Sequence, residues 1–166
     1  MQCARPVGIV DACICIDLCN SSLLDTLLLL PYQLIVPDVV AQQELKPTDL
    51  DRLLAIGACI GTASAQEVAM VDCLRQVHPR PSTYDLFVLA MAITRHAVLL
   101  SNDKHLRDAA RREGLIPLGI LGLLDMFETS VPGPRLAVAL ECILKGGARL
   151  PATECESRIR RWQQPP

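Results

Sequence analysis

Four acidic residues lie at positions where the fold could bring them together. Asp11 follows the apolar run "VGIV", Glu44 lies in "DVVAQQEL", Asp85 lies in "STYDLFVLAMA", and Asp103 follows "VLLSN". At an effective dielectric near 20, two carboxylates about 4 Å apart repel each other by roughly 4 kcal/mol. A solvent-accessible cluster of oxygen ligands relieves that repulsion best with a hard dication, so these residues predict a Mg²⁺ or Mn²⁺ site.

The polar residues beside Asp103 suit the same chemistry. In "VLLSNDKHL", Ser101 and Asn102 follow three apolar residues that are typical of the end of a buried strand. They would supply oxygen ligands or hold water at the strand exit. Taken alone, Asp85 or Asp103 is better explained as a helix cap and Glu44 as a solvated helix residue. The metal-site hypothesis therefore depends on the four acids acting together.

Strands and helices alternate along the chain. Short apolar runs predict strands, and longer segments with caps or helical periodicity predict helices. The expected strands are 6–11, 33–37, 58–63 at an edge, 97–101 and 115–120, and the expected helices are 12–30 in two pieces, 38–45, 48–57, 65–77, 84–96 and 103–114. A helical remainder follows, with turns at 131–134 and 146–151 and a capping box at 153–156.

This alternation predicts an α/β fold with a mostly parallel sheet that is covered on both faces. Asp11 and Asp103 follow strands whose carboxyl ends share one edge, where ligands usually bind in open parallel sheets. Asp85 starts the helix that leads into one of these strands, and Glu44 lies on a helix that follows another. All four acids are therefore expected at one rim of the sheet.

Composition excludes several classes of protein. The chain of 166 residues is 51% hydrophobic, which suits a single domain with a large aliphatic core. Its net charge of −2 does not indicate a broad basic surface that would bind nucleic acid. Asp25 and Pro31 interrupt the longest apolar run, which is too short for a membrane helix. These features predict a soluble, cytoplasmic protein without a membrane segment.

The cysteines do not form a metal or disulfide pattern. The chain has eight cysteines but no C-x-x-C pair, and no signal peptide precedes them. We interpret them as small buried residues in a reducing cytosol rather than as ligands or disulfides.

The order of the acids resembles that of the PIN-domain nucleases. The matching segments are "IVDA" with Asp11, "VVAQQEL" with Glu44, "STYDLFVLAMA" with Asp85 and "LLSNDKHLRDAA" with Asp103, of which the last two are the most specific. The segment from "GILGLLDMF" to "TECESRIRRW" is similar to the longer helical tail of a prokaryotic, VapC-like subfamily.

The resemblance implies a three-layer α/β/α fold over residues 1–166, with 120–166 as a helical C-terminal extension. It implies a Mg²⁺- or Mn²⁺-dependent ribonuclease, frequent homodimers and often a cognate antitoxin protein. It assigns Asp11, Glu44, Asp85 and Asp103 as metal-binding acids, with Ser101 as the usual nearby hydroxyl. Asn102 departs from the pattern, because many relatives carry an acid there and a second metal site would be weakened. The high cysteine content is also unusual for the family.

The predicted function is endonucleolytic hydrolysis of RNA by the toxin of a type II toxin–antitoxin pair. Asp11 and Asp103 would bind the metal directly, Asp85 would hold the metal or its water, and Glu44 would orient or deprotonate the nucleophile. The number of metals and the target RNA stay open. The basic residues proposed to contact RNA, which could equally form a solvated helix face, are Lys104, His105, Arg107, Arg111 and Arg112.

Two other functions remain as alternatives. The first is a catalytically degenerate PIN-fold protein that serves as a binding or scaffold module. The second is a phosphatase or phosphoacceptor of another doubly wound fold. The second is disfavoured because "DACICID" lacks the Asp-x-Asp spacing, and neither a P-loop nor G-x-G-x-x-G occurs in the chain.

Overall fold

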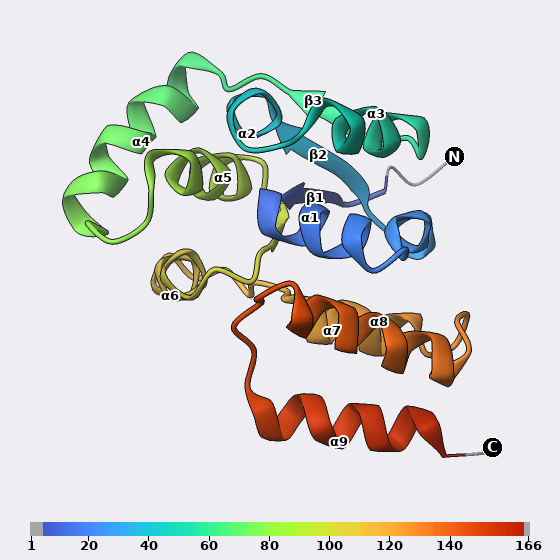
Figure 1. The fold of residues 1–166 in the computed structure, drawn as a ribbon. Coiled ribbons are helices and arrows are strands. Elements are labelled where there is room, and N and C mark those ends of the chain that lie inside the picture. The colour runs from blue at the N-terminus through green and yellow to red at the C-terminus, as the bar shows by residue number, and fades with distance from the viewer. Residues whose placement is uncertain (1–4, 165–166) are drawn as a thin grey trace.

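A parallel sheet forms the centre of the molecule. The computed structural model describes residues 5–164. Within them the sheet has the order β3-β2-β1-β4, and all three strand pairs are parallel (Figure 1). The strands are β1 (Val7–Val10), β2 (Gln33–Pro37), β3 (Cys59–Gly61) and β4 (Val98–Leu100). The predicted parallel α/β fold is confirmed, and β3 lies at the edge as expected.

Helices cover both faces of this sheet. They are α1 (Ala12–Asn20), the 3₁₀ helix η1 (Leu24–Leu29), α2 (Asp38–Gln43), α3 (Pro47–Ala55), α4 (Ala65–Val77), α5 (Thr83–Thr94), α6 (Lys104–Arg112), α7 (Ile120–Phe127), α8 (Gly133–Lys145) and α9 (Ala152–Gln163). The strands advance from β1 to β3 in one direction, and β4 lies on the other side of β1. Because parallel crossovers are right-handed, the two directions place their helices on opposite faces. Accordingly, α1 packs with α3 and α8, whereas α5 packs with α4 and α6.

The most deeply buried helix is α5. It contacts β1, β2 and β4, and Leu86, Val88, Leu89 and Met91 are fully buried along it. This confirms the expectation that an almost entirely apolar helix packs in the interior. A fixed α5 in turn fixes the position of its first turn, which carries Asp85.

Two local predictions need correction, and a third is confirmed. The segment 115–120 forms one parallel bridge, between Leu100 and Leu118, instead of a full strand, because Pro117 has no N–H to continue a ladder. Helix α9 begins at Ala152 after Pro151 and has no side-chain cap, so the predicted capping box at 153–156 is wrong. The helical segment 12–30 does divide into α1 and η1, and Ser22 has a positive φ of 58° at the break.

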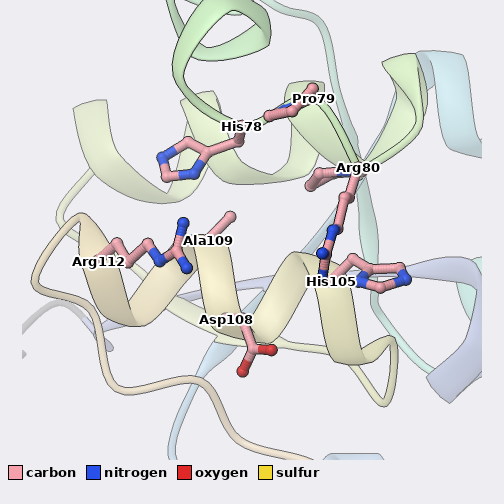
Figure 2. Close-up of a pocket in the computed structure, with 8 residues that line it drawn as sticks. His78, Pro79, Arg80, His105, Asp108, Ala109 and Arg112 are labelled. Carbon is pink, nitrogen blue, oxygen red and sulfur yellow. The ribbon is translucent and has the colours of Figure 1, made fainter.

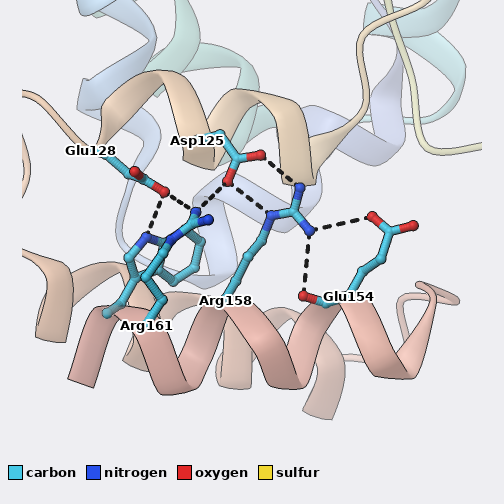
Figure 3. Close-up of polar contacts among 6 residues, drawn as sticks. Asp125, Glu128, Glu154, Arg158 and Arg161 are labelled. Atoms are coloured by element: carbon cyan, nitrogen blue, oxygen red, sulfur yellow. Dashed lines mark hydrogen bonds and ion pairs between the residues drawn. The ribbon is translucent and has the colours of Figure 1, made fainter. Parts of the chain in front are cut away.

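Ion pairs fasten the last helix to the rest of the chain. Arg158 contacts Asp125 of α7 at 2.6 Å, and Arg161 contacts Asp125 at 3.0 Å and also Glu128 (Figure 3). The indole Nε1 of the buried Trp162 donates to Glu128 at 2.8 Å. These contacts join α9 to α7, while most of its packing is against α8.

The cysteines only partly follow the prediction. Cys15, Cys19 and Cys155 are buried, but Cys59, Cys73 and Cys142 are exposed. All of these, and the half-buried Cys13, are free thiols. Cys3 lies outside the described residues. None of the helices between residues 5 and 164 is long and apolar enough to cross a bilayer.

Candidate functional site

The carboxyl ends of β1 and β4 bring the first two site residues together. Val10 pairs with Leu100, so the next residue on each strand, Asp11 and Ser101, leaves the sheet side by side. The Asp11 N–H donates to the Leu100 carbonyl at 3.0 Å, and the Ser101 Oγ donates to Asp11 Oδ2 at 2.6 Å. Asp11 is 4% exposed and Ser101 is fully buried. Asp11 is therefore held rigidly at the base of the rim.

Asp103 is positioned by the start of α6. Its Oδ1 accepts the Leu106 N–H at 2.8 Å as a helix N-cap, and its own N–H donates to Ser101 Oγ at 3.0 Å. The Ser101 hydroxyl thus links Asp103 to Asp11. Within residues 5–164, Asp103 Oδ2 accepts no hydrogen bond, so this oxygen is available to a ligand.

Asp85 occupies an equivalent position at the start of α5. Ser82 is the N-cap: its Oγ accepts the Asp85 N–H at 3.1 Å, and Asp85 Oδ2 accepts the Ser82 N–H at 2.7 Å. This reciprocal capping box leaves Oδ1 of Asp85 without a hydrogen-bond partner in the described chain. Asp85 and Asp103 therefore both take part in helix caps, as expected. Each carboxylate still has one oxygen that could bind a ligand.

Glu44 is exposed and directly follows the last residue of α2. Partial loss of solvation, followed by the negative charges of Asp11 and Asp85, raises the pKa of Glu44 to about 7. The structure thus brings Glu44 within electrostatic reach of two of the other acids. A carboxyl group with this pKa can exchange a proton near neutral pH.

The four acids behave as one electrostatic group, called here the acid rim (Asp11, Glu44, Asp85 and Asp103). Burial raises the pKa of Asp11, and the charge of Asp103 adds to the effect. Burial likewise raises the pKa of Asp85, with contributions from the charges of Asp11 and Asp103. Between residues 5 and 164, no lysine, arginine or histidine forms an ion pair with any of the four. Their mutual repulsion is therefore not relieved by the protein.

The acid rim is not a closed set of metal ligands. In the described part of the chain, no three His, Cys, Asp or Glu side chains are grouped so that they could hold a metal ion. Asp85 and Asp103 each use one carboxylate oxygen in the cap of their own helix. The remaining donors are all oxygen, which fits Mg²⁺ or Mn²⁺ better than a softer metal.

Sequence reasoning did not assign Cys13 or Asp17 to the site. Cys13 Sγ donates to Asp11 Oδ2 at 2.9 Å and accepts the Asn102 N–H at 3.1 Å. Burial and the adjacent Asp11 raise the pKa of the Cys13 thiol, so it stays protonated and acts as a hydrogen-bond donor. Asp17 lies four residues later, on the same face of α1, and this i,i+4 spacing is the signal that could have identified the pair.

Asn102 uses both ends of its amide. Its Nδ2 donates to Asp17 Oδ2 at 2.8 Å, and its Oδ1 accepts the Ile120 N–H at the start of α7 at 2.8 Å. Burial raises the pKa of Asp17 to about 6, although the Asn102 hydrogen bond opposes this. An acid at position 102 could not donate to Asp17 and would add negative charge. The asparagine is thus explained by its two contacts.

The predicted RNA-contacting residues do not share one face. Lys104 and His105 are exposed in the first turn of α6. Arg107 is half-buried, and its guanidinium lies where a Cβ at Gly119 would meet it at 3.2 Å. Arg111 is exposed and donates to Asp108 at 2.9 Å, and Arg112 is exposed as well. Only part of the predicted basic surface is therefore available to a ligand.

Comparisons with known proteins agree with the observed fold. One similar structure is that of a PilT N-terminus domain protein from the hyperthermophilic archaeon Sulfolobus solfataricus P2, with a TM-score of 0.52 and 16% sequence identity. The similarity covers 74% of this chain and 94% of the archaeal one, and at this identity it shows the fold alone. No curated protein matches the sequence. The family model described as "PIN domain" matches residues 7–164. This chain therefore belongs to the PIN-domain family, whose members are generally nucleases.

Proposed function

We propose that this chain is a metal-dependent endoribonuclease whose active site is the acid rim. The observation that carries the proposal is that each of four carboxylates, from four separate segments, lies within electrostatic reach of at least two others and has no cationic partner among residues 5–164. Folding such a group costs stability, and a bound dication would remove that cost. Membership of a family of nucleases supports phosphodiester hydrolysis as the reaction.

Each residue has a distinct role in the proposed reaction. Asp11, Asp85 and Asp103 would hold Mg²⁺ or Mn²⁺ through carboxylate oxygens, and Ser101 orients Asp11 through its 2.6 Å hydrogen bond. When bound, the ion supplies positive charge to the phosphate and acidity to an attacking water. Glu44, with its pKa near 7, would accept the proton of that water.

The test compares the unsubstituted protein with Asp85→Asn and Asp103→Asn. Asparagine keeps an oxygen acceptor for each helix cap, so both variants should fold, as circular dichroism would verify. We expect Mn²⁺-dependent cleavage of a labelled structured RNA by the unsubstituted protein and at least a hundredfold lower rate in each variant. Full activity in both variants would reject the assignment.

A second candidate is a PIN-fold binding module without catalysis. The observation that favours it is the absence of a ready group of three ligands among residues 5–164. Titration with Mn²⁺ separates the two candidates, because a working site gains thermal stability by linkage and a degenerate one does not.

The biological part of the proposal is a cytoplasmic toxin that forms a homodimer and is neutralised by a cognate antitoxin protein. It rests on the likeness of the helical tail to that of the VapC-like subfamily. Induced expression should arrest bacterial growth, Asp85→Asn should not, and co-expression of a small protein encoded directly upstream should restore growth. Unimpaired growth of cells that contain soluble, RNA-cleaving protein would refute the toxin role.

A further inference from the structure

A cavity of about 200 Å³ lies between the loop 78–81 and helix α6, and we call it the Arg80 pocket (Figure 2). Arg80, His105 and Arg112 line it, together with the acid Asp108. In Figure 2 the Asp108 carboxylate points away from the loop, and it accepts a hydrogen bond from Arg111 at 2.9 Å. The pocket is therefore lined by more positive than negative groups.

The loop that carries Arg80 is held in place from both sides. Pro79 and Pro81 flank Arg80, and each proline ring fixes its own φ and favours an extended conformation in the residue before it. His78 is 4% exposed, and its Nε2 lies 2.6 Å from Glu113 Oε1, just beyond the end of α6. The loop is thus fastened to α6. The backbone of the loop is thus already in place, and ligand binding would cost it little further conformational entropy.

The two arginines of the pocket have no ion-pair partner in the described part of the chain. Within residues 5–164, neither Arg80 nor Arg112 forms an ion pair, whereas Arg95, Arg158 and Arg161 do. A guanidinium group matches the geometry of a phosphate and binds it with two hydrogen bonds. Two such groups at one cavity, with space for several water molecules of about 30 Å³ each, suit a phosphate group.

The pocket is adjacent to the acid rim. Its loop runs directly into Ser82 and the first turn of α5, which carries Asp85, and α6 begins at Asp103. His105 lines the pocket and also a neighbouring cavity of about 560 Å³, which Cys13, Asn102 and Asp103 border. A polyanion that contacts the acid rim through a metal could therefore continue past His105 into the Arg80 pocket.

We propose that the Arg80 pocket binds a phosphodiester group of an RNA strand, at a position along the strand other than the bond that is cleaved. The choice of RNA as the ligand rests on the proposed function. Contacts to phosphate fix the position of a strand without reading its sequence. The pocket would thus increase affinity and set the register of the strand at the acid rim.

The test is fluorescence anisotropy with a labelled single-stranded RNA in EDTA, so that no cleavage occurs. The variant is Arg80→Gln with Arg112→Gln. The control is Arg52→Gln with Arg160→Gln, which removes the same charge from exposed arginines of α3 and α9, whose ion pairs are long at 3.9 and 3.8 Å. We expect about tenfold weaker binding for the pocket variant, and a dependence of log K on log salt that is shallower by about 0.7, because one contact to a single-strand phosphate is lost.

Equal loss of affinity in the two double variants, or no RNA binding by the unsubstituted protein, would overturn the pocket proposal. If the pocket double variant melts early, Arg112→Gln alone carries the test, with about threefold weaker binding expected. Absence of Mn²⁺-dependent cleavage together with the expected loss of binding would refute the proposed function and leave the pocket intact. Cleavage by the unsubstituted protein with equal binding by both double variants would refute the pocket alone.

Discussion

The carboxylates of the acid rim and the carboxylate of Glu67 lie in opposite electrostatic environments. Glu67 of α4 is 2% exposed, and its pKa is lowered to about 2, chiefly because Arg95 donates to it at 2.7 and 3.0 Å. Glu44 is exposed, and yet its pKa is raised to about 7. Exposure alone would predict the reverse order. At Glu67 the hydrogen bonds from Arg95 outweigh burial and lower the pKa, whereas at Glu44 partial loss of solvation, followed by the charges of Asp11 and Asp85, raises it.

This contrast separates structural acids from candidate functional ones. Ser64 and Thr94 complete the hydrogen bonds of Glu67, so that its charge is satisfied within the protein and fixes α4 against α5. Hydrogen bonds orient Asp11, Asp85 and Asp103 of the acid rim, but no cationic side chain within residues 5–164 forms an ion pair with it. A group of this kind is suited to a ligand that comes from solution.

The largest expected effect is the loss of the Glu67 ion pair. Glu67→Gln would leave the Arg95 guanidinium, 26% exposed, without its charged partner. We expect a fall of about 3 kcal/mol in the free energy of unfolding, measured by urea denaturation. The control is Glu154→Gln, which removes an exposed 3.3 Å pair with Arg158 and should cost less than about 0.5 kcal/mol. Equal effects of the two substitutions would remove the contrast.

Metal binding is the next largest effect. At a Mn²⁺ concentration about 100 times its dissociation constant, linkage adds about 2.7 kcal/mol to the stability of the protein. A thermal-shift titration with Mn²⁺ should show a rise in melting temperature for the unsubstituted protein and no rise for Asp103→Asn. The Glu67→Gln variant should keep the gain, because Glu67 belongs to the structural group. Equal gains in all three proteins would indicate binding elsewhere.

Removing one rim charge should stabilise the metal-free protein. Asp85→Asn keeps an acceptor for the Ser82 N–H but removes the repulsion from Asp11 and Asp103. We expect a gain of about 1 kcal/mol in EDTA at pH 8, measured by urea denaturation. Asp72→Asn, an exposed change on α4, is the control. A destabilised Asp85→Asn protein would mean that the favourable charge at the start of α5 outweighs the repulsion.

The smallest effect is the dependence of stability on pH. Because the folded-state pKa of Glu44 is raised to about 7, the folded protein binds more protons than the unfolded chain between about pH 4.5 and 7. Stability in EDTA should therefore fall as pH rises through this range, and Glu44→Gln should reduce the slope. The pKa of Glu67 is lowered to about 2, so the stability that its charge contributes should instead be lost as the pH falls from about 4.5 toward 2. An unchanged slope in Glu44→Gln would exclude Glu44 as the titrating group.

The predictable parts of the fold and site are those that depend on local sequence. Apolar runs identified β1, β2 and β4, and Asp103, considered as a helix cap, marked the start of α6. The approach of Asp11 and Ser101 followed from the rule that parallel strands share a carboxyl edge.

The other features depend on contacts between distant residues. Asn102 bonds to Asp17, 85 positions away in the sequence, and no local pattern specifies that pairing. Cys13, on an apolar helix, has the sequence context of an ordinary core residue, although it bonds to Asp11. The last expected strand became one bridge because the missing N–H of Pro117 outweighed the apolar run around it.

The amide of Asn102 makes the C-terminal helices part of the site's geometry. The N–H of Ile120 donates to Asn102 Oδ1. A glycine at position 119 suits this contact, because a Cβ there would approach the same oxygen at 3.2 Å. Loss of the α9 ion pairs, or displacement of the C-terminal helices, would shift α7. That shift would move Asn102, which lies between Ser101 and Asp103 in the sequence. A protein shortened at residue 119 would thus have a rearranged strand exit, even with every acidic side chain still present.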